Sequence, residues 1–246
     1  MGARRRLAAG RLWRGPVKRV AILQSNYIPW KGYFDLIAAV DEFILFDDMQ
    51  FTRRDWRNRN LVKTPRGLEW ITVPVSVKGR YLQKICETQV SDPDWGETHW
   101  ATLVHNYSKA PFFELYRPVF EPLYQRRELL LSAVNFGFIT AICGILGIAT
   151  RLSWSMDYRP LKEGKTERLV DLCNRAEGTQ YISGPAAREY INPALFEAAG
   201  IALSFFDYSG YPAYTQRFGK FEHGVTILDL LFNEGPQARR FMKSLA

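Results

Sequence analysis

The feature that most constrains the fold is an alternation of apolar and polar segments between residues 19 and 60. A short apolar run at 20–23 leads into a polar, aromatic turn that carries Pro29 and Gly32. A helical apolar pattern follows, and then a second apolar run ends on Asp47 and Asp48. This order predicts a strand, a loop, a helix and a second strand. Because open α/β sheets bind ligands beyond the carboxyl ends of their strands, the polar residues there predict a site.

The rest of the chain continues this alternation after one interruption. Apolar runs on both sides of Pro65-Arg66-Gly67 predict a β-hairpin, and helical patterns fill about 93–149. Further apolar runs at 152–155, 180–183 and 201–206 alternate with helical patterns at 165–176 and 225–232. We therefore predict a single α/β domain over residues 19–246: a mainly parallel sheet flanked by helices, with a β-hairpin and a helical insertion.

Residues 129–150 carry no charged side chain and are long enough to span a bilayer of about 30 Å. Ser132, Asn135 and Thr140 interrupt this run, and a strand pattern follows directly from Arg151. The pattern therefore favours a buried helix, and we expect no membrane association.

The net charge of +8 belongs mainly to the first residues of the chain. Residues 1–16 hold five arginines and no acid, which leaves +3 for residues 17–246. We predict a flexible basic extension over residues 1–18; the alternative is a natural translation start near Val17. The nearly balanced domain argues against nucleic acid as a partner. The three cysteines have no close pair and no metal-ligand spacing, which favours a reducing cytoplasm and no metal site.

An arginine-rich loop follows the second strand. Arg53, Arg54, Arg57 and Arg59 lie within seven residues, and their spacing does not form one helical stripe. Guanidinium groups bind phosphate or carboxylate through two parallel hydrogen bonds. The loop therefore either converges on an anion or is an exposed, solvated segment.

Acid–base candidates occur on this strand edge and in the helical insertion. Asp47 and Asp48 could hold a divalent cation or act as a general base, or Asp48 could cap a turn while Asp47 pairs with an arginine. His105 lies beside Asn106 and Tyr107, and a neutral imidazole can act as a base near pH 7. The alternative for His105 is a structural role.

Two later loops carry binding candidates. Ser183 and Gly184 form a tight turn after a strand, where backbone amides could meet a phosphate. This turn resembles the serine-glycine turn of HIGH-type nucleotidyltransferases, although the opening loop has no His-x-Gly-His. Tyr214 and Gln216 belong to an aromatic, polar loop before the last helix.

Taken in order, these segments resemble the WbqC-like protein family over about residues 19–236. The matching segments include Leu23-Gln24, Tyr27-Ile28-Pro29-Trp30-Lys31-Gly32-Tyr33-Phe34, Asp47-Asp48, Gln50-Phe51, Trp56-Arg57-Asn58-Arg59, Tyr181-Ile182-Ser183-Gly184-Pro185 and Ile227-Leu228-Asp229-Leu230-Leu231-Phe232. Thr215 stands where the family's Tyr-Pro-Gln element has proline. The resemblance implies a small-molecule-modifying or sugar-modifying role in the cytoplasm, within a polysaccharide or natural-product pathway. Acyl or aminoacyl transfer to an amine or amino sugar is the leading idea, and no catalytic residue is established.

Three functions remain open. The first is a transferase acting on a small-molecule or sugar-linked substrate, with an acyl carrier among the candidate partners and His105 or Asp48 as the base. The second is a HIGH-like nucleotidyltransferase that uses a nucleotide triphosphate and Mg²⁺. The third is a non-catalytic module that binds a ligand or partner. The cofactor and the oligomeric state are not predicted. The candidate pocket residues are Gln24, Asn26, Tyr27, Trp30, Arg54, Arg57, Asn58, Arg59, Ser183, Gly184, Tyr214 and Gln216.

Overall fold

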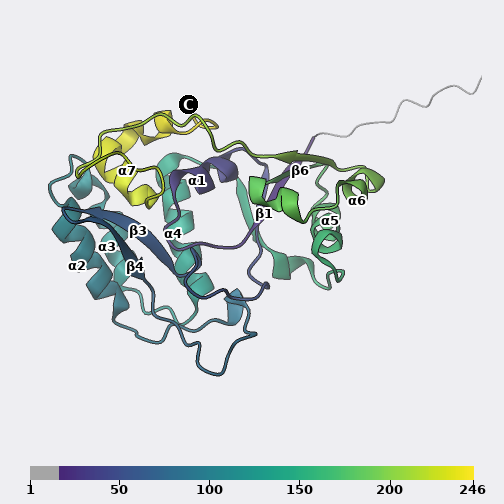
Figure 1. Ribbon diagram of the computed structural model, residues 1–246, viewed down its shortest axis with the longest axis horizontal. Helices are drawn as coiled ribbons and strands as arrows, with labels where there is room; N and C mark the ends of the chain where they lie inside the picture. Colours follow the sequence, from purple (N-terminus) through teal and green to yellow (C-terminus); the bar gives the residue numbers. More distant parts are fainter. Residues whose placement is uncertain (1–16) are drawn as a thin grey trace, which may run out of the picture.

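A five-stranded parallel sheet forms the centre of the computed structural model, which describes residues 17–246 (Figure 1). The strands lie in the order β5, β2, β1, β6, β7. Their bounds are Arg151–Trp154 for β5, Glu42–Leu45 for β2, Arg19–Leu23 for β1, Gln180–Ser183 for β6 and Ala202–Phe205 for β7. The mainly parallel sheet is confirmed. The predicted basic extension lies outside the described residues, except for its last two positions.

The two faces of the sheet are covered by different helices because strand side chains alternate between the faces. Ala21 and Phe43 pack with α1 (Lys31–Ala38) and α4 (Leu131–Leu146) in the larger core. Val20 and Ile44 pack on the opposite face with α5 (Lys165–Arg175) and α6 (Pro193–Ala198). The continuous apolar runs of the central strands follow from this burial on both faces.

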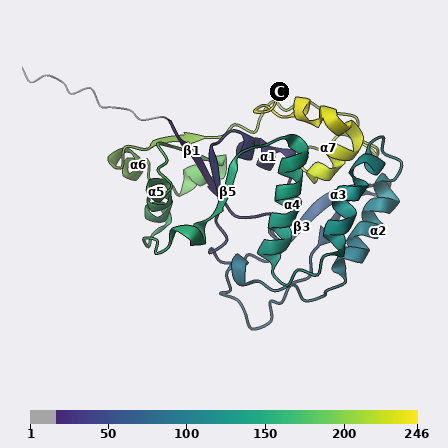
Figure 2. The same ribbon diagram turned by 180° about the vertical axis from the view of Figure 1, so that it is seen from behind.

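A second layer lies beside the sheet, at the end of the molecule away from α5 and α6 (Figures 1 and 2). It contains the antiparallel hairpin of β3 (Arg59–Thr64) and β4 (Gly67–Thr72), with α2 (Trp95–Tyr107), α3 (Phe113–Gln125) and α7 (Ile227–Glu234). Aromatic rings hold it together; the centroids of Phe113 and Phe232 are 5.0 Å apart. The hairpin and the helical insertion are thus confirmed. Four 3₁₀ segments complete the structure: η1 (Ile85–Glu87), η2 (Ser155–Tyr158), η3 (Pro185–Glu189) and η4 (Gly235–Phe241).

The structure differs from the sequence-based expectation at two helices. Proline lacks the backbone N–H that a helix needs, so Pro118 and Pro122 predict an interruption of the second helix of the insertion, but α3 continues through both. Both prolines lie on its exposed side, where water can solvate the carbonyl groups that lose a backbone donor. The residues between Gly184 and Tyr190 also predict a helix from the sequence, but this segment forms only the 3₁₀ segment η3.

The uncharged run at 129–150 forms the buried helix α4 and its flanks. Within the described residues, no helix is both long and apolar enough to cross a membrane. Ser132 and Asn135 lie on the buried side of α4, where their polar atoms take part in the site described below.

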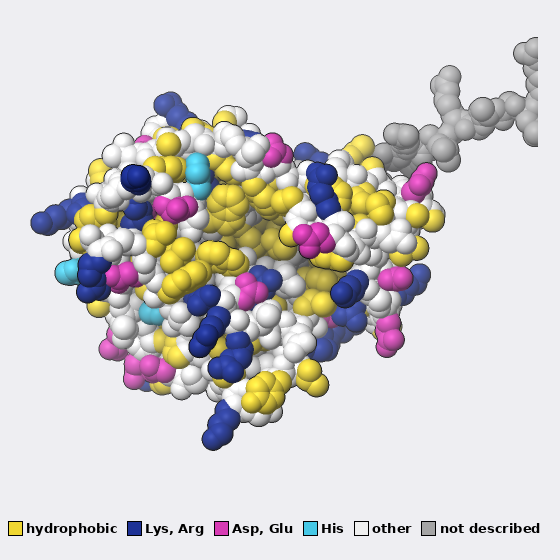
Figure 3. Space-filling model, in the orientation of Figure 1, with side chains coloured by type: hydrophobic (Ala, Val, Ile, Leu, Met, Phe, Trp, Pro, Cys, Tyr) yellow, Lys and Arg dark blue, Asp and Glu magenta, His cyan; other side chains and the backbone are white. Residues whose placement is uncertain are grey.

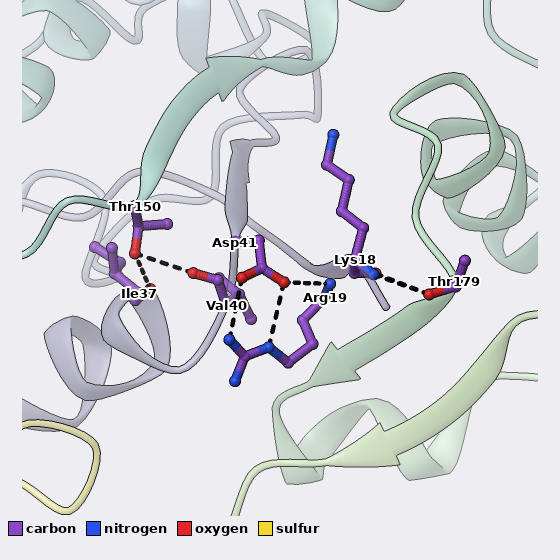
Figure 4. Close-up of polar contacts among 7 residues, drawn as sticks. All are labelled: Lys18, Arg19, Ile37, Val40, Asp41, Thr150 and Thr179. Atoms are coloured by element: carbon purple, nitrogen blue, oxygen red, sulfur yellow. Dashed lines mark hydrogen bonds and ion pairs between the residues drawn. The ribbon is translucent and has the colours of Figure 1, made fainter. Parts of the chain in front are cut away.

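Side-chain contacts fix the amino edge of the sheet (Figure 4). The backbone N–H of Arg19 donates to Asp41 Oδ2 over 2.7 Å, and its guanidinium pairs with the same carboxylate. Thr150 Oγ1 donates to the carbonyl of Ile37 over 2.7 Å, so the start of β5 is tied to the end of α1. These contacts hold the amino ends of β1, β2 and β5 together.

The strand order places a crevice at that carboxyl edge. From β1 the chain builds the sheet outward through β2 to β5, and it then returns to the other side of β1 to add β6 and β7. The loops that follow β1 and β6 therefore diverge. Such a topological switch point is where ligands bind in open α/β sheets.

Candidate functional site

A cleft of about 490 Å³ lies at the switch point, and we call it the switch-point cleft. Gln24 follows β1, Phe46 and Met49 follow β2, and Lys165 and Arg168 come from the first turn of α5. Figure 3 shows this face of the molecule hollowed near its centre, with hydrophobic side chains in the hollow. The cleft thus combines an apolar wall with a basic one.

The basic wall suits an anionic group. The first N–H groups of α5 have no partner within the helix, and its dipole favours negative charge at this end. Arg168 donates to the carbonyl of Lys162 over 3.3 Å, and its Nη1 lies 3.5 Å from Met49 Sδ. Among the ion pairs of the described residues, none involves Lys165 or Arg168. Both cations are therefore available to a ligand.

A second cleft, of about 310 Å³, is largely aromatic, and we call it the aromatic cleft. Trp30 comes from the loop after β1, Trp56 from the arginine-rich loop, and His223 from the loop before α7. Gly32 permits this arrangement, since a Cβ there would lie 2.3 Å from the indole of Trp30. The glycine of the opening segment therefore serves close packing of the tryptophan that lines the cleft.

Arg57 joins the two clefts. Its Nη1 donates to Asn26 Oδ1 over 2.5 Å, and its Nη2 donates to Gln24 Oε1 over 3.0 Å. Gln24 lines the switch-point cleft, whereas Asn26 lines the aromatic cleft. Arg57 thus links a lining residue of one cleft to a lining residue of the other, and we call these three side chains the Arg57 ridge. The Nε of Arg57 is buried and has no hydrogen-bond partner.

Asp47 anchors the backbone segments that carry this ridge. Its carboxylate accepts three hydrogen bonds of 2.7 Å, from the Ser25 N–H, the Ser25 hydroxyl and the Ser132 hydroxyl. Asn135 donates to Ser25 Oγ over 3.0 Å and to the Arg57 carbonyl over 2.9 Å. Burial raises the pKa of Asp47, although these donors and the charge of Arg57 oppose the shift. These contacts fit a positioning role for Asp47. They account for its burial without the divalent cation or the arginine partner that the sequence suggested.

Neither of the two candidate bases, Asp48 or His105, lines either cleft. Asp48 is buried, accepts a 2.5 Å hydrogen bond from the Ser155 hydroxyl and lies 3.8 Å from Arg159. His105 is exposed on α2 and lines neither cleft. The described residues contain no group of three or more His, Cys, Asp or Glu side chains that could hold a metal.

Tyr27 supports the opening loop from inside the core. Its ring is fully buried, and its hydroxyl lies 2.9 Å from His99 Nδ1 and 3.2 Å from the Tyr124 hydroxyl. Burial lowers the pKa of His99 to about 4, so the imidazole is neutral at pH 7 and its Nδ1 can accept a hydrogen bond from the Tyr27 hydroxyl. Tyr27 therefore contributes its backbone, and not its ring, to the loop that lines the clefts.

The arginine-rich loop divides between two sites. Trp56 and Arg57 belong to the aromatic cleft and the Arg57 ridge. Arg54, Asn58 and Arg59 instead line a third cleft beside the hairpin. Of the four predicted arginines, Arg53, Arg54 and Arg59 thus share this third cleft, and Arg57 lies apart from them at the ridge.

Ser183 and Gly184 lie at the carboxyl end of β6. The Ser183 hydroxyl accepts a 3.2 Å hydrogen bond from Tyr181, whose ring lines the switch-point cleft. Gly184 precedes the first turn of the 3₁₀ segment η3. The predicted turn therefore lies next to the cleft but does not line it, because Tyr181 lies between Ser183 and the cleft.

Tyr214 and Gln216 hold the loop that carries His223. Both donate to Asp229 Oδ1, over 2.8 and 2.9 Å, and Tyr107 donates to Asp229 Oδ2 over 2.9 Å. Gln216 also accepts from the buried Lys63 ammonium over 2.9 Å. This buried network anchors the loop to the hairpin and α7, so these residues position the aromatic cleft.

A buried lysine influences the histidine of the aromatic cleft. Lys31 Nζ donates to the Pro212 carbonyl over 3.0 Å and lies 5.1 and 5.3 Å from the ring centroids of Tyr211 and Tyr214. Burial lowers the pKa of Lys31 to about 8. Burial, and then the charge of Lys31, lower the pKa of His223, which keeps that imidazole neutral at pH 7.

The chain is an α/β protein with a cleft at a topological switch point of its parallel sheet. The chain belongs to the WbqC-like protein family, which matches residues 24–241. It is 53% identical over 228 residues to the uncharacterized protein Rv1507c of Mycobacterium tuberculosis, across 92% of this chain and 98% of that relative. No solved structure matches the chain.

Proposed function

We propose that the protein transfers an acyl or aminoacyl group from a phosphate-bearing activated donor to an amine of a small-molecule or sugar-linked acceptor. The observation that carries the proposal is the meeting of two chemically different clefts at the Arg57 ridge. A transferase has to hold two substrates with their reacting atoms adjacent. We place this activity in the cytoplasm, in a polysaccharide or natural-product pathway.

The donor occupies the switch-point cleft in this proposal. Its phosphate binds the amino end of α5, with Lys165 and Arg168 supplying charge-assisted hydrogen bonds. The apolar part of the donor packs on Phe46 and Met49. The carbonyl to be transferred then lies at the Arg57 ridge.

The acceptor occupies the aromatic cleft, where the rings of Trp30 and Trp56 present flat apolar surface to a sugar or another small molecule. The acceptor nitrogen attacks the donor carbonyl and a C–N bond forms. The C–O or C–S bond to the phosphate-bearing group breaks, and that group leaves with the electron pair. His223, neutral at pH 7, takes the proton lost by the nitrogen. Arg57 stabilises the negative charge that develops on the carbonyl oxygen.

Nucleotidyl transfer is the second candidate function, and the switch-point cleft supports it. A phosphate site at the switch point of a parallel sheet suits a nucleotide as well as an acyl donor. ATP, with and without Mg²⁺, therefore belongs among the probes in the experiment that follows.

The first test is a calorimetric titration with acetyl-coenzyme A, ATP and a uridine diphosphate sugar. We expect at least one probe to bind, and Arg168→Gln to weaken it about tenfold, since hydrogen bonds to charged groups contribute about 1.5–3 kcal/mol. Arg175→Gln is the matched control, because Arg175 lies at the other end of α5 and pairs with Asp171 at 3.0 Å. Failure of every probe to bind, or equal affinity for Arg168→Gln and wild type, would contradict the donor assignment.

A further inference from the structure

The third cleft has a basic wall and an apolar wall, and the proposed transfer reaction uses neither. It encloses about 340 Å³ beside the hairpin, and we call it the hairpin cleft. Arg53, Arg54 and Arg59 form its basic wall, and Phe51 and Val77 belong to its apolar wall. Among the described residues, no carboxylate lines it.

Arg59 is held in a fixed orientation within this cleft. Its guanidinium carbon lies 4.0 Å from the centroid of the Trp70 ring, and its Nη2 donates to the Arg54 carbonyl. Arg54 adopts a left-handed backbone conformation with φ of +57°, which is uncommon for a residue with a side chain. The Nε of Arg59 is buried without a hydrogen-bond partner. A local arrangement that fixes a guanidinium before any ligand arrives is typical of a binding site.

Asn58 supplies an independent indication of a ligand. Its side chain is 6% exposed and lines the hairpin cleft, and its amide nitrogen donates to the Val73 carbonyl over 2.9 Å. The Oδ1 atom has no partner. A buried acceptor without a donor is costly, and Asn58 holds one beside the hairpin cleft. Among the ion pairs of the described residues, none involves Arg53, Arg54 or Arg59.

An aromatic partition separates the hairpin cleft from the aromatic cleft. Trp70 carries Arg59 on its ring, and the centroids of Trp56 and Trp70 are 5.1 Å apart with an interplanar angle of 48°. Trp56 in turn lines the aromatic cleft. The hairpin cleft is thus a site of its own, and a ligand in it would not occupy the acceptor position.

We propose that the hairpin cleft binds the phosphate or diphosphate group of an amphiphilic molecule. Three guanidinium groups in one cleft repel one another, and a doubly charged oxyanion removes that cost while accepting paired hydrogen bonds. The apolar wall then contacts the carbon chain beside the phosphate. This site lies beyond the proposed transfer reaction and does not depend on it.

The rim of the hairpin cleft continues into a loop with two exposed hydrophobic side chains. Phe51 N–H donates to the Gln83 carbonyl over 2.9 Å, and Gln50 Nε2 donates to the Tyr81 carbonyl over 2.7 Å. Tyr81 and Leu82 are 71% and 82% exposed. The amphiphile is therefore either a soluble phosphate ester or a lipid whose chain rests on this loop.

The test follows the indole N–H NMR signal of Trp70 during titration with inorganic pyrophosphate. We expect a saturable shift in the wild type, and an affinity about tenfold weaker both in Arg59→Gln and in the Arg53→Gln, Arg54→Gln double variant, which keeps the contact with Trp70. Arg66→Gln removes the same charge from the hairpin turn, where the side chain is 84% exposed and pairs with Glu69. It is expected to bind like the wild type, as is Arg168→Gln in the switch-point cleft.

The proposal is overturned if Trp70 shows no saturable shift, or if Arg66→Gln weakens binding as much as Arg59→Gln does. The Arg168→Gln variant reports on the switch-point cleft alone. A negative pyrophosphate result therefore does not contradict the donor assignment, and a negative calorimetric result with Arg168→Gln does not contradict the hairpin-cleft proposal. Sedimentation with phosphatidylcholine vesicles, with and without phosphatidic acid, then distinguishes a lipid ligand from a soluble phosphate ester. Retention that requires phosphatidic acid and is lost in Leu82→Ser identifies a lipid, whereas pyrophosphate binding without retention identifies a soluble phosphate ester.

Discussion

Replacing Asp47 with alanine is expected to lower the free energy of unfolding by about 3–5 kcal/mol. The change leaves the Ser25 N–H and two hydroxyls, of Ser25 and Ser132, buried without their 2.7 Å acceptor. Each unsatisfied buried polar group costs about 1–3 kcal/mol. The variant no longer has to bury the carboxylate charge, and this gain offsets part of the summed cost. The expected loss therefore lies in the lower half of the summed range.

Urea unfolding measures this change, with two variants for comparison. Asp47→Asn keeps one acceptor oxygen and is expected to lose about half as much stability. Glu197→Ala removes an exposed acid from α6 and is expected to change stability by less than about 0.5 kcal/mol. A loss below about 1 kcal/mol for Asp47→Ala would show that the carboxylate does not hold the Arg57 ridge to α4.

Acidification is expected to remove about 3 kcal/mol of stability through His99 alone. Its folded-state pKa of about 4 lies below its ordinary value of 6.5, so the unfolded chain binds the proton more readily. The stabilisation of the neutral imidazole is complete above pH 6.5 and is lost progressively as the pH falls toward 4. The size follows from about 1.4 kcal/mol for each pKa unit.

Two histidine variants identify the source of this pH dependence. His99→Gln is expected to flatten the dependence of unfolding free energy between pH 4 and pH 6.5, because no imidazole then titrates beside Tyr27. His105→Gln, an exposed position on α2, is expected to keep the wild-type slope. The same slope in His99→Gln and wild type would rule out His99 as its cause.

Local patterns predicted the elements of this fold well because each depends on neighbouring residues. The apolar run before Gln24 and the run that ends at Asp47 became β1 and β2, and the turn at Pro65-Arg66-Gly67 became the hairpin. The order of the strands depends on contacts distant in sequence. The pairing of β1 with β6, about 160 residues later, is not readable from either strand.

The site was predicted only in part for the same reason. The loop after β1 was expected to line a pocket, and Gln24, Asn26 and Trp30 do line the two clefts. The sequence from Lys165 to Arg168 predicts a helix start that could hold an anion. It was not joined to the predicted pocket, because only the pairing of β1 with β6 brings α5 opposite Gln24. His223 had no distinguishing signal in the sequence, since its role follows from the cleft and from the charge of Lys31.

The central claim is that the two clefts hold the donor and the acceptor of one reaction at the Arg57 ridge. The most direct measurement is the initial rate of amide formation by mass spectrometry, using the donor identified by titration and an amino sugar. Arg57→Ala is expected to be about a hundredfold slower, the size of effect seen when reacting groups lose their alignment. Arg240→Ala removes an exposed arginine and is expected to match the wild type. Equal rates for Arg57→Ala and wild type, or no amide from wild type with both substrates bound, would contradict the claim.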